Sequence, residues 1–224
     1  MEKIVIFEEK YSSENIKEIL EIKGLVLKDS DRSFVKVIDY KGEKLIVKKP
    51  VDKNRRKWER IMSVFRDGEG LRVLKTMEIL NKNGICSNLP IALIEYRKNS
   101  MIVDSYIIYT YIEGNNIVAD DAEKVIELIK KIHKTGYLHS DTQVRNFLNS
   151  NGEILTIDAK LKKKLLGKIS ENLEYIGFAV DIKEGYNYIN TKSLWFIIAK
   201  IIYESFRLKR RVRQYFKNRK KLCK

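Results

Sequence analysis

HSDTQVRN, at residues 139–146, is the most informative segment of this 224-residue chain. It separates a predicted helix from a predicted strand and holds a carboxylate, Asp141, five residues before an amide, Asn146. Asp158 follows twelve residues later, at the end of the largely apolar run 154–157. A short hairpin would bring Asn146 and Asp158 together, and amide and carboxylate oxygens are hard ligands that suit Mg²⁺.

A purely structural interpretation competes with this one. Asp and Asn residues commonly cap turns, and each of these residues alone would be interpreted that way. Their joint spacing, with a strand directly before Asp158, favours a functional site instead. Asp141 would then orient a hydroxyl group and accept its proton. His139 is expected to orient the loop through hydrogen bonds, and His133 to be packed near a helix end; neither is assigned to catalysis.

Strand patterns dominate the first half of the chain. Short apolar or alternating segments bounded by turn residues predict strands at 4–7, 25–28, 34–40, 44–49, 91–96 and 106–112. Helical periodicity predicts helices over 13–23 and from about 69 to 83. A basic segment after Pro50 also has helical spacing, with Trp58, Ile61, Met62 and Phe65 on one face.

Helical patterns dominate after the break at Glu113-Gly114. A helix is predicted from Asp120 to Lys134, and the apolar segment 194–203 is predicted to be a buried helix, too short to cross a bilayer. We therefore predict an α+β fold with two lobes. Residues 1–113 would form an antiparallel-sheet lobe, and residues 114–224 a helical lobe.

The pattern H-x-D-x-x-x-x-N followed by I-D resembles the catalytic loop of the protein-kinase-like superfamily. The resemblance implies transfer of a phosphoryl group from ATP, with Asp141 as catalytic residue and Asn146 and Asp158 holding Mg²⁺. It also implies a catalytic lysine on the third strand, and Lys48 would there hold the α- and β-phosphates. Side chains alternate along a strand, so only one of Lys48 and Lys49 can face the nucleotide.

Two further parts of the nucleotide site follow from this resemblance. A glutamate partner for Lys48 is expected on the next helix, where Glu69 is preferred over Glu59 and Glu78. The segment YTYIEG at 109–114 resembles the hinge between the lobes, so backbone groups of Thr110 and Ile112 are expected to meet the adenine edge.

The phosphate-covering loop departs from the superfamily pattern. No G-x-G-x-x-G lies between the first hairpin strands, where the sequence is Asp29-Ser30-Asp31-Arg32-Ser33. Backbone amides at Ser30 and Ser33 are the expected phosphate contacts. The glycine that usually follows the metal aspartate by two residues is also absent.

Over its whole length the chain resembles the lipopolysaccharide core heptose(II) kinase family. The matching segments are VLKDSDRSFVKVIDYKGEKLIVKKP, YTYIEG, LHSDTQVRNFL and TIDAKLKKK, in that order, followed by a Lys- and Arg-rich end. The resemblance implies a cytoplasmic enzyme, peripheral on the inner face of the inner membrane. Its substrates would be ATP, with Mg²⁺, and a heptose of the lipopolysaccharide inner core or another sugar acceptor.

The chain carries a formal net charge of +15, and residues 207–224 hold ten Lys or Arg and no acid. Such a tail is either a solvated basic segment or a contact with an anionic surface. Val212, Tyr215 and Phe216 lie among its cations and favour a membrane surface. No aromatic-rich recognition motif supports a nucleic-acid partner.

Two other functions stay open from the residues alone. The chain could phosphorylate another small hydroxyl compound, although a cationic acceptor such as an aminoglycoside would need an acidic pocket. It could instead be a non-catalytic binding protein on a kinase-like scaffold, since the glycine-rich loop is missing.

Overall fold

The structure, a computed structural model, describes the backbone of residues 1–222 and the side chains of residues 1–216. Two compact units make up the chain: Met1–Gly114 with Leu155–Lys160, and Asn115–Ile154 with Leu161–Lys224. Residues 155–160, expected in the second lobe, therefore belong to the first unit.

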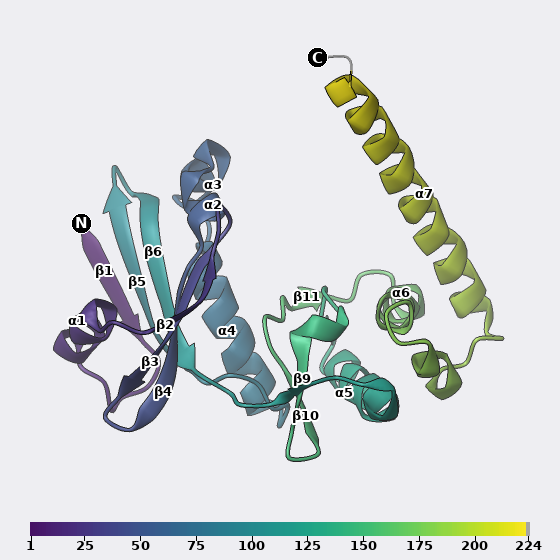
Figure 1. Cartoon of the computed structure of the whole chain (residues 1–224), viewed down its shortest axis with the longest axis horizontal. Coiled ribbons are helices and arrows are strands. Elements are labelled where there is room, and N and C mark those ends of the chain that lie inside the picture. Colours follow the sequence, from purple (N-terminus) through teal and green to yellow (C-terminus); the bar gives the residue numbers. More distant parts are fainter. Residues whose placement is uncertain (223–224) are drawn as a thin grey trace. The chain divides into compact units, whose positions relative to one another are not determined.

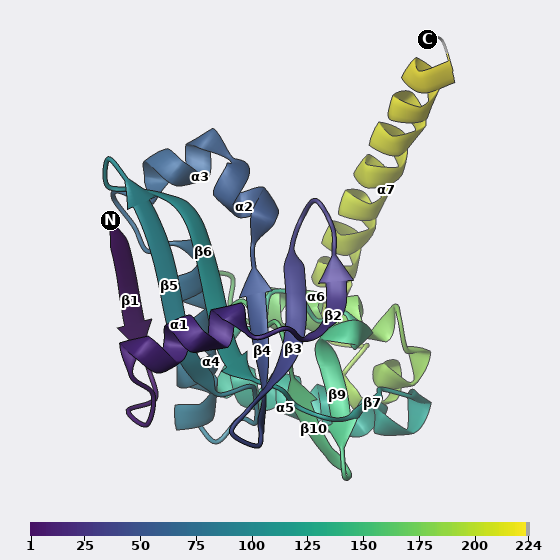
Figure 2. The same cartoon turned by 60° about the vertical axis from the view of Figure 1, so that its left-hand side comes forward.

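The first unit is built on one antiparallel sheet in the strand order β1-β5-β6-β4-β3-β2 (Figures 1 and 2). Its strands are β1 (Glu2–Ile6), β2 (Leu25–Asp29), β3 (Phe34–Tyr40), β4 (Glu43–Lys49), β5 (Pro90–Lys98) and β6 (Met101–Thr110). Its helices are α1 (Ser13–Glu21), α2 (Val51–Arg55), α3 (Lys57–Met62) and α4 (Glu69–Lys82). All six predicted strands are present.

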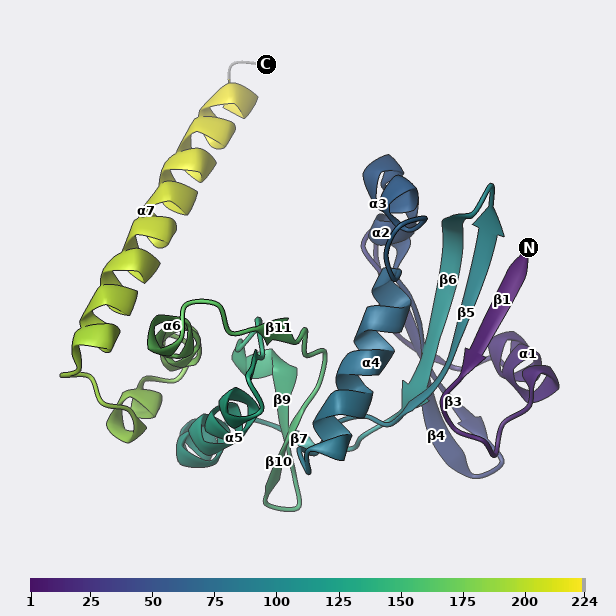
Figure 3. The ribbon, with the colours of Figure 1, turned by 180° about the vertical axis from the view of Figure 1, so that it is seen from behind.

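Helices α1 and α4 cover opposite faces of this sheet (Figure 3). Ile16 and Ile19 of α1 pack on one core, while Leu74 and Met77 of α4 pack on the other. Gly70 lets the first turn of α4 approach the sheet, because a Cβ atom there would lie 2.4 Å from a Leu93 methyl group. The sheet therefore fixes where α4 begins.

The apolar face of helix α3 is exposed and does not pack against the sheet. Trp58, Ile61 and Phe65, which share one face in the sequence pattern, are all exposed. The buried positions of the segment are polar instead, namely Asn54 and Ser63. Helical periodicity thus identifies the helix but not the face that meets the sheet.

The second unit consists of helices with short strand pairs. Its helices are α5 (Ala122–Lys134), α6 (Lys168–Ala179) and α7 (Leu194–Leu222), with 3₁₀ turns η1 (Ala119–Asp121), η2 (Val144–Asn146) and η3 (Lys183–Tyr188). β9 (Phe147–Ser150) lies between β7 (Asn115–Asn116) and β10 (Glu153–Thr156), whose last two residues belong to the first unit. β8 (Tyr137–Leu138) pairs with β11 (Lys162–Lys163).

Among the described side chains, helix α7 packs on α6 through its first turns. Phe196 and Ala199 are buried there, whereas Leu194, Ile197 and Ile201 are exposed. The prediction of a buried helix over 194–203 is therefore right for one face only. None of the helices in the described part of the chain combines the length and apolar character needed to span a bilayer.

Candidate active site

Lys48 and Asp158 form an ion pair in the first unit. Nζ of Lys48, on β4, lies 2.8 Å from Oδ1 of Asp158, 110 residues later in the chain. The Lys48 side chain is 18% exposed and that of Asp158 is 44% exposed, so the carboxylate is the more open partner. Oδ2 of Asp158 makes no hydrogen bond with any described residue and can take another cation.

The segment around Asp158 is tied to the sheet. The Thr156 N–H donates to the Cys86 carbonyl oxygen at 3.2 Å, which brings this segment into the first unit. Asp158 itself has φ 55°, in the left-handed region that non-glycine residues seldom enter. Such residues cluster at functional sites, where surrounding contacts maintain the strain. Burial and the Asp158 charge together raise the pKa of Tyr109, at the end of β6.

Lys49 has different partners from Lys48. Its Nζ atom donates to Asp104 and, at 3.1 Å, to the Tyr106 hydroxyl, both on β6. Burial lowers the pKa of Lys49, but the hydrogen bonds to Asp104 and Tyr106 outweigh burial, and the net shift is upward. Lys48 is thus the lysine of this strand that faces Asp158.

Glu69 opens α4, as expected, but its ion pairs differ from those predicted. Its carboxylate lies 3.0 Å from Arg72 and 3.8 Å from Lys160. Among the described residues, no ion pair joins Glu69 to Lys48, because Lys48 is held by Asp158 instead. Lys160, which follows Asp158 by two residues, is the second cation beside Glu69, after Arg72.

The rival glutamates also have other partners. Glu59 pairs with Lys53 and Arg66, and Glu78 pairs with Lys82 one turn along α4. Neither has an ion pair with Lys48 in the described structure.

The loop between β2 and β3 is closed on itself. The Ser30 hydroxyl donates to the Ser33 carbonyl oxygen at 3.2 Å and accepts the N–H groups of Arg32 and Ser33 at 3.4 and 3.3 Å. Ser33 is buried. The N–H groups of Ser30 and Ser33, expected to contact phosphates, are engaged within the loop: the Ser30 N–H donates to the Ser33 carbonyl oxygen at 3.2 Å, and the Ser33 N–H donates to the Ser30 hydroxyl.

Backbone groups of the expected hinge are also partly engaged in hydrogen bonds within the first unit. The Thr110 N–H donates to the Leu89 carbonyl oxygen at 3.0 Å, and the Thr110 carbonyl accepts from the Asn88 amide at 2.8 Å. Ile112 lies beyond the end of β6 and is half-buried. Of the two residues predicted to meet adenine, Ile112 has the backbone less committed to the sheet.

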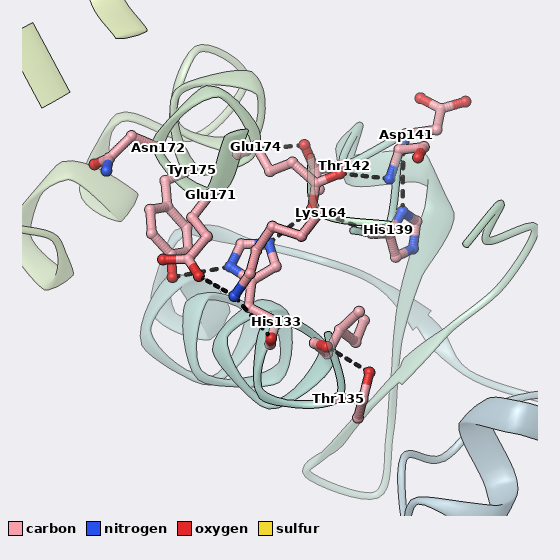
Figure 4. A network of polar contacts seen from close by, with 12 residues as sticks. His133, Thr135, His139, Asp141, Thr142, Lys164, Glu171, Asn172, Glu174 and Tyr175 are labelled. Carbon is pink, nitrogen blue, oxygen red and sulfur yellow. Dashed lines mark hydrogen bonds and ion pairs between the residues drawn. The ribbon is translucent and has the colours of Figure 1, made fainter. Parts of the chain in front are cut away.

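In the second unit, Glu174 of α6 holds the HSDTQVRN loop (Figure 4). Its carboxylate accepts the N–H of His139 at 3.0 Å and the N–H of Ser140. Its backbone carbonyl accepts the Thr142 hydroxyl at 2.9 Å. The same carboxylate lies 2.8 Å from Nε2 of His133, on α5. This buried network fixes the backbone on both sides of Asp141.

Asp141 is held through its own backbone groups, which bond to the side chains of His139 and Asn146. Its N–H donates to Nδ1 of His139 at 3.3 Å, and its carbonyl accepts the Asn146 amide at 2.8 Å. Figure 4 shows the Asp141 carboxylate pointing away from the network. Because the Asn146 nitrogen is bound to Asp141, its amide oxygen remains for a cation. His139 is fully buried against Phe147, which fits its expected orienting role.

Ser140 carries local strain in this loop. Its φ is 67°, and within the described structure its hydroxyl oxygen is buried without a hydrogen-bond partner. The Glu174 carboxylate accepts the Ser140 N–H and so holds this backbone conformation. Of the non-glycine residues with positive φ, Ser140 directly precedes Asp141 and Asp158 is itself a predicted metal ligand, whereas Lys41, Asn99, Ser100 and Asn151 lie outside the predicted site.

Glu174 is the functional residue that the sequence analysis missed. Its partners are backbone groups about 35 residues earlier, which no local spacing reveals. One signal was present: an acid stands between the apolar residues Leu173 and Ile176, within the part of the chain predicted to form the helical lobe. A buried carboxylate must have hydrogen-bond partners, so an acid at an inward position points to a polar network.

Replacing Glu174 with Gln should lower both stability and turnover. A Gln amide keeps one acceptor oxygen but leaves the N–H of His139 or Ser140 unsatisfied, which costs about 1–3 kcal/mol. Urea unfolding would measure that loss. In an assay of phosphate transfer from ATP, the activity that the sequence motif predicts, the turnover number should fall while the KM for ATP stays constant. Glu171→Gln, on the same helix and paired with Lys164, is the matched control. Unchanged turnover in Glu174→Gln would contradict the positioning role.

Comparisons with known proteins bear on the fold. No family model and no curated protein matches the chain. Among solved structures, it is similar to one described as WaaP in complex with acyl carrier protein. The TM-score is 0.50 at 13% sequence identity, and the match covers 91% of this chain and 89% of that chain. At this identity the likeness establishes the architecture alone. The chain therefore has the two-lobed protein-kinase-like fold that its sequence predicts.

Proposed function

We propose that the chain is an ATP-dependent kinase that phosphorylates a heptose of the lipopolysaccharide inner core. The observation that carries the proposal is the Lys48–Asp158 pair, formed by the two residues that the sequence motifs assign to phosphate and metal binding. The braced loop around Asp141 supports the same activity. The sequence resemblance to heptose(II) kinases supports the particular acceptor.

Each residue has a defined role in this proposal. Lys48 neutralises the α- and β-phosphates of ATP, and Asp158 and Asn146 supply oxygen ligands for Mg²⁺. These ligands fit Mg²⁺, because each offers a hard oxygen that is not used in a hydrogen bond with the described residues. The bound ion would neutralise charge on the transferred phosphate. Asp141 accepts the proton of the sugar hydroxyl.

A hollow beside the catalytic loop supports a sugar acceptor. It has a volume of about 410 Å³ and is lined by Asn116, Gln143, Val144, Arg145 and Asp181. Amide, guanidinium and carboxylate groups together suit the hydroxyls of a sugar and an anionic substituent on it. We assign the acceptor to this hollow, with Arg145 as its cation.

The direct test is incubation of the purified protein with ATP, Mg²⁺ and dephosphorylated lipopolysaccharide core. Mass spectrometry should show one added phosphate on a heptose. Phosphate on a different small hydroxyl compound, with none on the core, would favour the alternative kinase. ATP binding with no transfer to any acceptor would favour a non-catalytic binding protein.

We also propose that the basic C-terminal segment contacts an anionic membrane. Val212, Tyr215 and Phe216 are exposed on α7 among Arg and Lys residues. The side chains of residues 217–224, which hold half of the tail cations, lie outside the described residues. The contact would keep the enzyme beside a membrane-bound acceptor.

Removal of residues 207–224 should weaken membrane association and spare activity on a soluble acceptor. Sedimentation with anionic vesicles would measure the first effect, with an expected loss of about tenfold or more. The α6–α7 contact through Phe196 and Ala199 is retained, so the fold should persist. An identical membrane-bound fraction after truncation would rule out the tail as a membrane contact.

A further inference from the structure

The segment of α2 and α3, residues 51–66, is an amphipathic segment with its polar side inward. Trp58 is 66% exposed and Phe65 is 79% exposed, and Ile61 and Val64 between them are also exposed. These four residues, here called the α3 patch, form an apolar surface on a short stretch of chain. Exposed aromatic clusters of this kind mark interaction sites.

Hydrogen bonds hold the segment in this orientation. The Asn54 amide nitrogen donates to Asp104 at 2.9 Å, and its oxygen accepts the Ser105 hydroxyl at 3.1 Å. The Ser63 hydroxyl accepts the N–H of Ile102 at 2.9 Å. Turning the α3 patch inward would break these buried bonds with β6. Its exposure is therefore built into the first unit.

The surroundings of the α3 patch are positively charged. Residues 51–66 include six Lys or Arg and two acids. Asp52 is paired with Arg56, and Glu59 is paired with Lys53 and Arg66. The remaining exposed cations, Arg55 and Lys57, have no ion pair with any described residue; Lys57 directly precedes Trp58 in the sequence, and Arg55 stands two residues before Lys57.

We propose that the α3 patch docks onto a bilayer surface that contains anionic lipid. Trp and Phe prefer the interface between headgroups and acyl chains, and adjacent Arg and Lys bind anionic headgroups. Charge decides against a second copy of the chain, because two such patches would bring like charges together. The inference is independent of the proposed kinase activity and of the C-terminal tail, which belongs to the other unit.

Tryptophan fluorescence can test the docking directly in the full chain. The chain has two tryptophans, Trp58 and Trp195, so Trp195→Phe leaves Trp58 as the reporter. Vesicles of phosphatidylcholine and phosphatidylglycerol in equal parts should shift the Trp58 emission to shorter wavelength. Vesicles of pure phosphatidylcholine should leave the Trp58 emission unchanged. An unshifted Trp58 emission while the protein sediments with the anionic vesicles would overturn the proposal, because another surface would then carry the binding.

Substitutions in the α3 patch supply the second test. Trp58→Ser combined with Phe65→Ser should lower vesicle partitioning about tenfold, as loss of interfacial anchors predicts. Leu25→Ser removes a residue that is 71% exposed in the same unit, and should leave partitioning unchanged. Equal partitioning of the double variant and the parent would overturn the proposal. The proposal would also be overturned if the parent protein formed a dimer in sedimentation velocity without vesicles and the double variant did not. The α3 patch would then bind a second copy of the chain.

Discussion

Asp141→Asn should abolish phosphate transfer and leave the binding of ATP and Mg²⁺ intact. The Asn side chain has nearly the same shape but cannot accept the proton of the acceptor hydroxyl. Loss of a general base lowers turnover by about 10²–10⁴-fold. The backbone contacts of Asp141 with His139 and Asn146 involve only its N–H and carbonyl, so the loop should keep its conformation.

Turnover with the heptose acceptor and calorimetric titration with ATP would separate the two effects. Asp120→Asn changes an exposed acid in the same unit and should behave as the parent protein. Transfer at the parental rate by Asp141→Asn would remove Asp141 from the mechanism, even if the chain remains a kinase.

Asp158→Ala should eliminate Mg²⁺-dependent ATP binding. The substitution removes the proposed metal ligand and leaves Lys48 without its partner at 2.8 Å. The Lys48–Asp158 pair is partly exposed, and pairs of this kind contribute about 1 kcal/mol or less to stability. The variant should therefore stay folded, and ATP affinity in the presence of Mg²⁺ should fall to its level with a metal chelator.

A matched ion pair provides the control for this variant. Lys75 and Asp67 are 2.7 Å apart in the same unit, and the Asp67 side chain is as exposed as that of Asp158. Asp67→Ala should unfold at nearly the parental urea concentration and bind ATP normally. Metal-dependent ATP binding that survives in Asp158→Ala would refute the assigned metal site.

Local patterns in the sequence were sufficient to predict the architecture. Alternation in residues 34–40 and 44–49 predicts β3 and β4 almost to the residue, because one side of that hairpin is buried. In the helix predicted from about 69 to 83, the apolar residues Leu74 and Met77 are three residues apart, and both are buried in α4. Such patterns succeed where the hydrophobic effect decides the orientation of an element.

Local patterns do not predict features that depend on polar contacts between distant segments. The orientation of α3 depends on the bonds of Asn54 and Ser63 with β6, which periodicity does not encode. Glu69 was predicted to pair with Lys48, but the motif gives no information about Lys160, whose position depends on the Asp158 segment. Ser30 could be identified as a loop residue, yet not as the acceptor that closes the loop.

The return of residues 155–160 to the first unit has a consequence for synthesis and for protein engineering. The ribosome makes the sheet first, then forty residues of the second unit, and only then the strand end that carries Asp158. The first unit is therefore incomplete until the middle of the second has emerged. A gene fragment ending at Gly114 would encode the whole six-stranded sheet but not the carboxylate that pairs with Lys48.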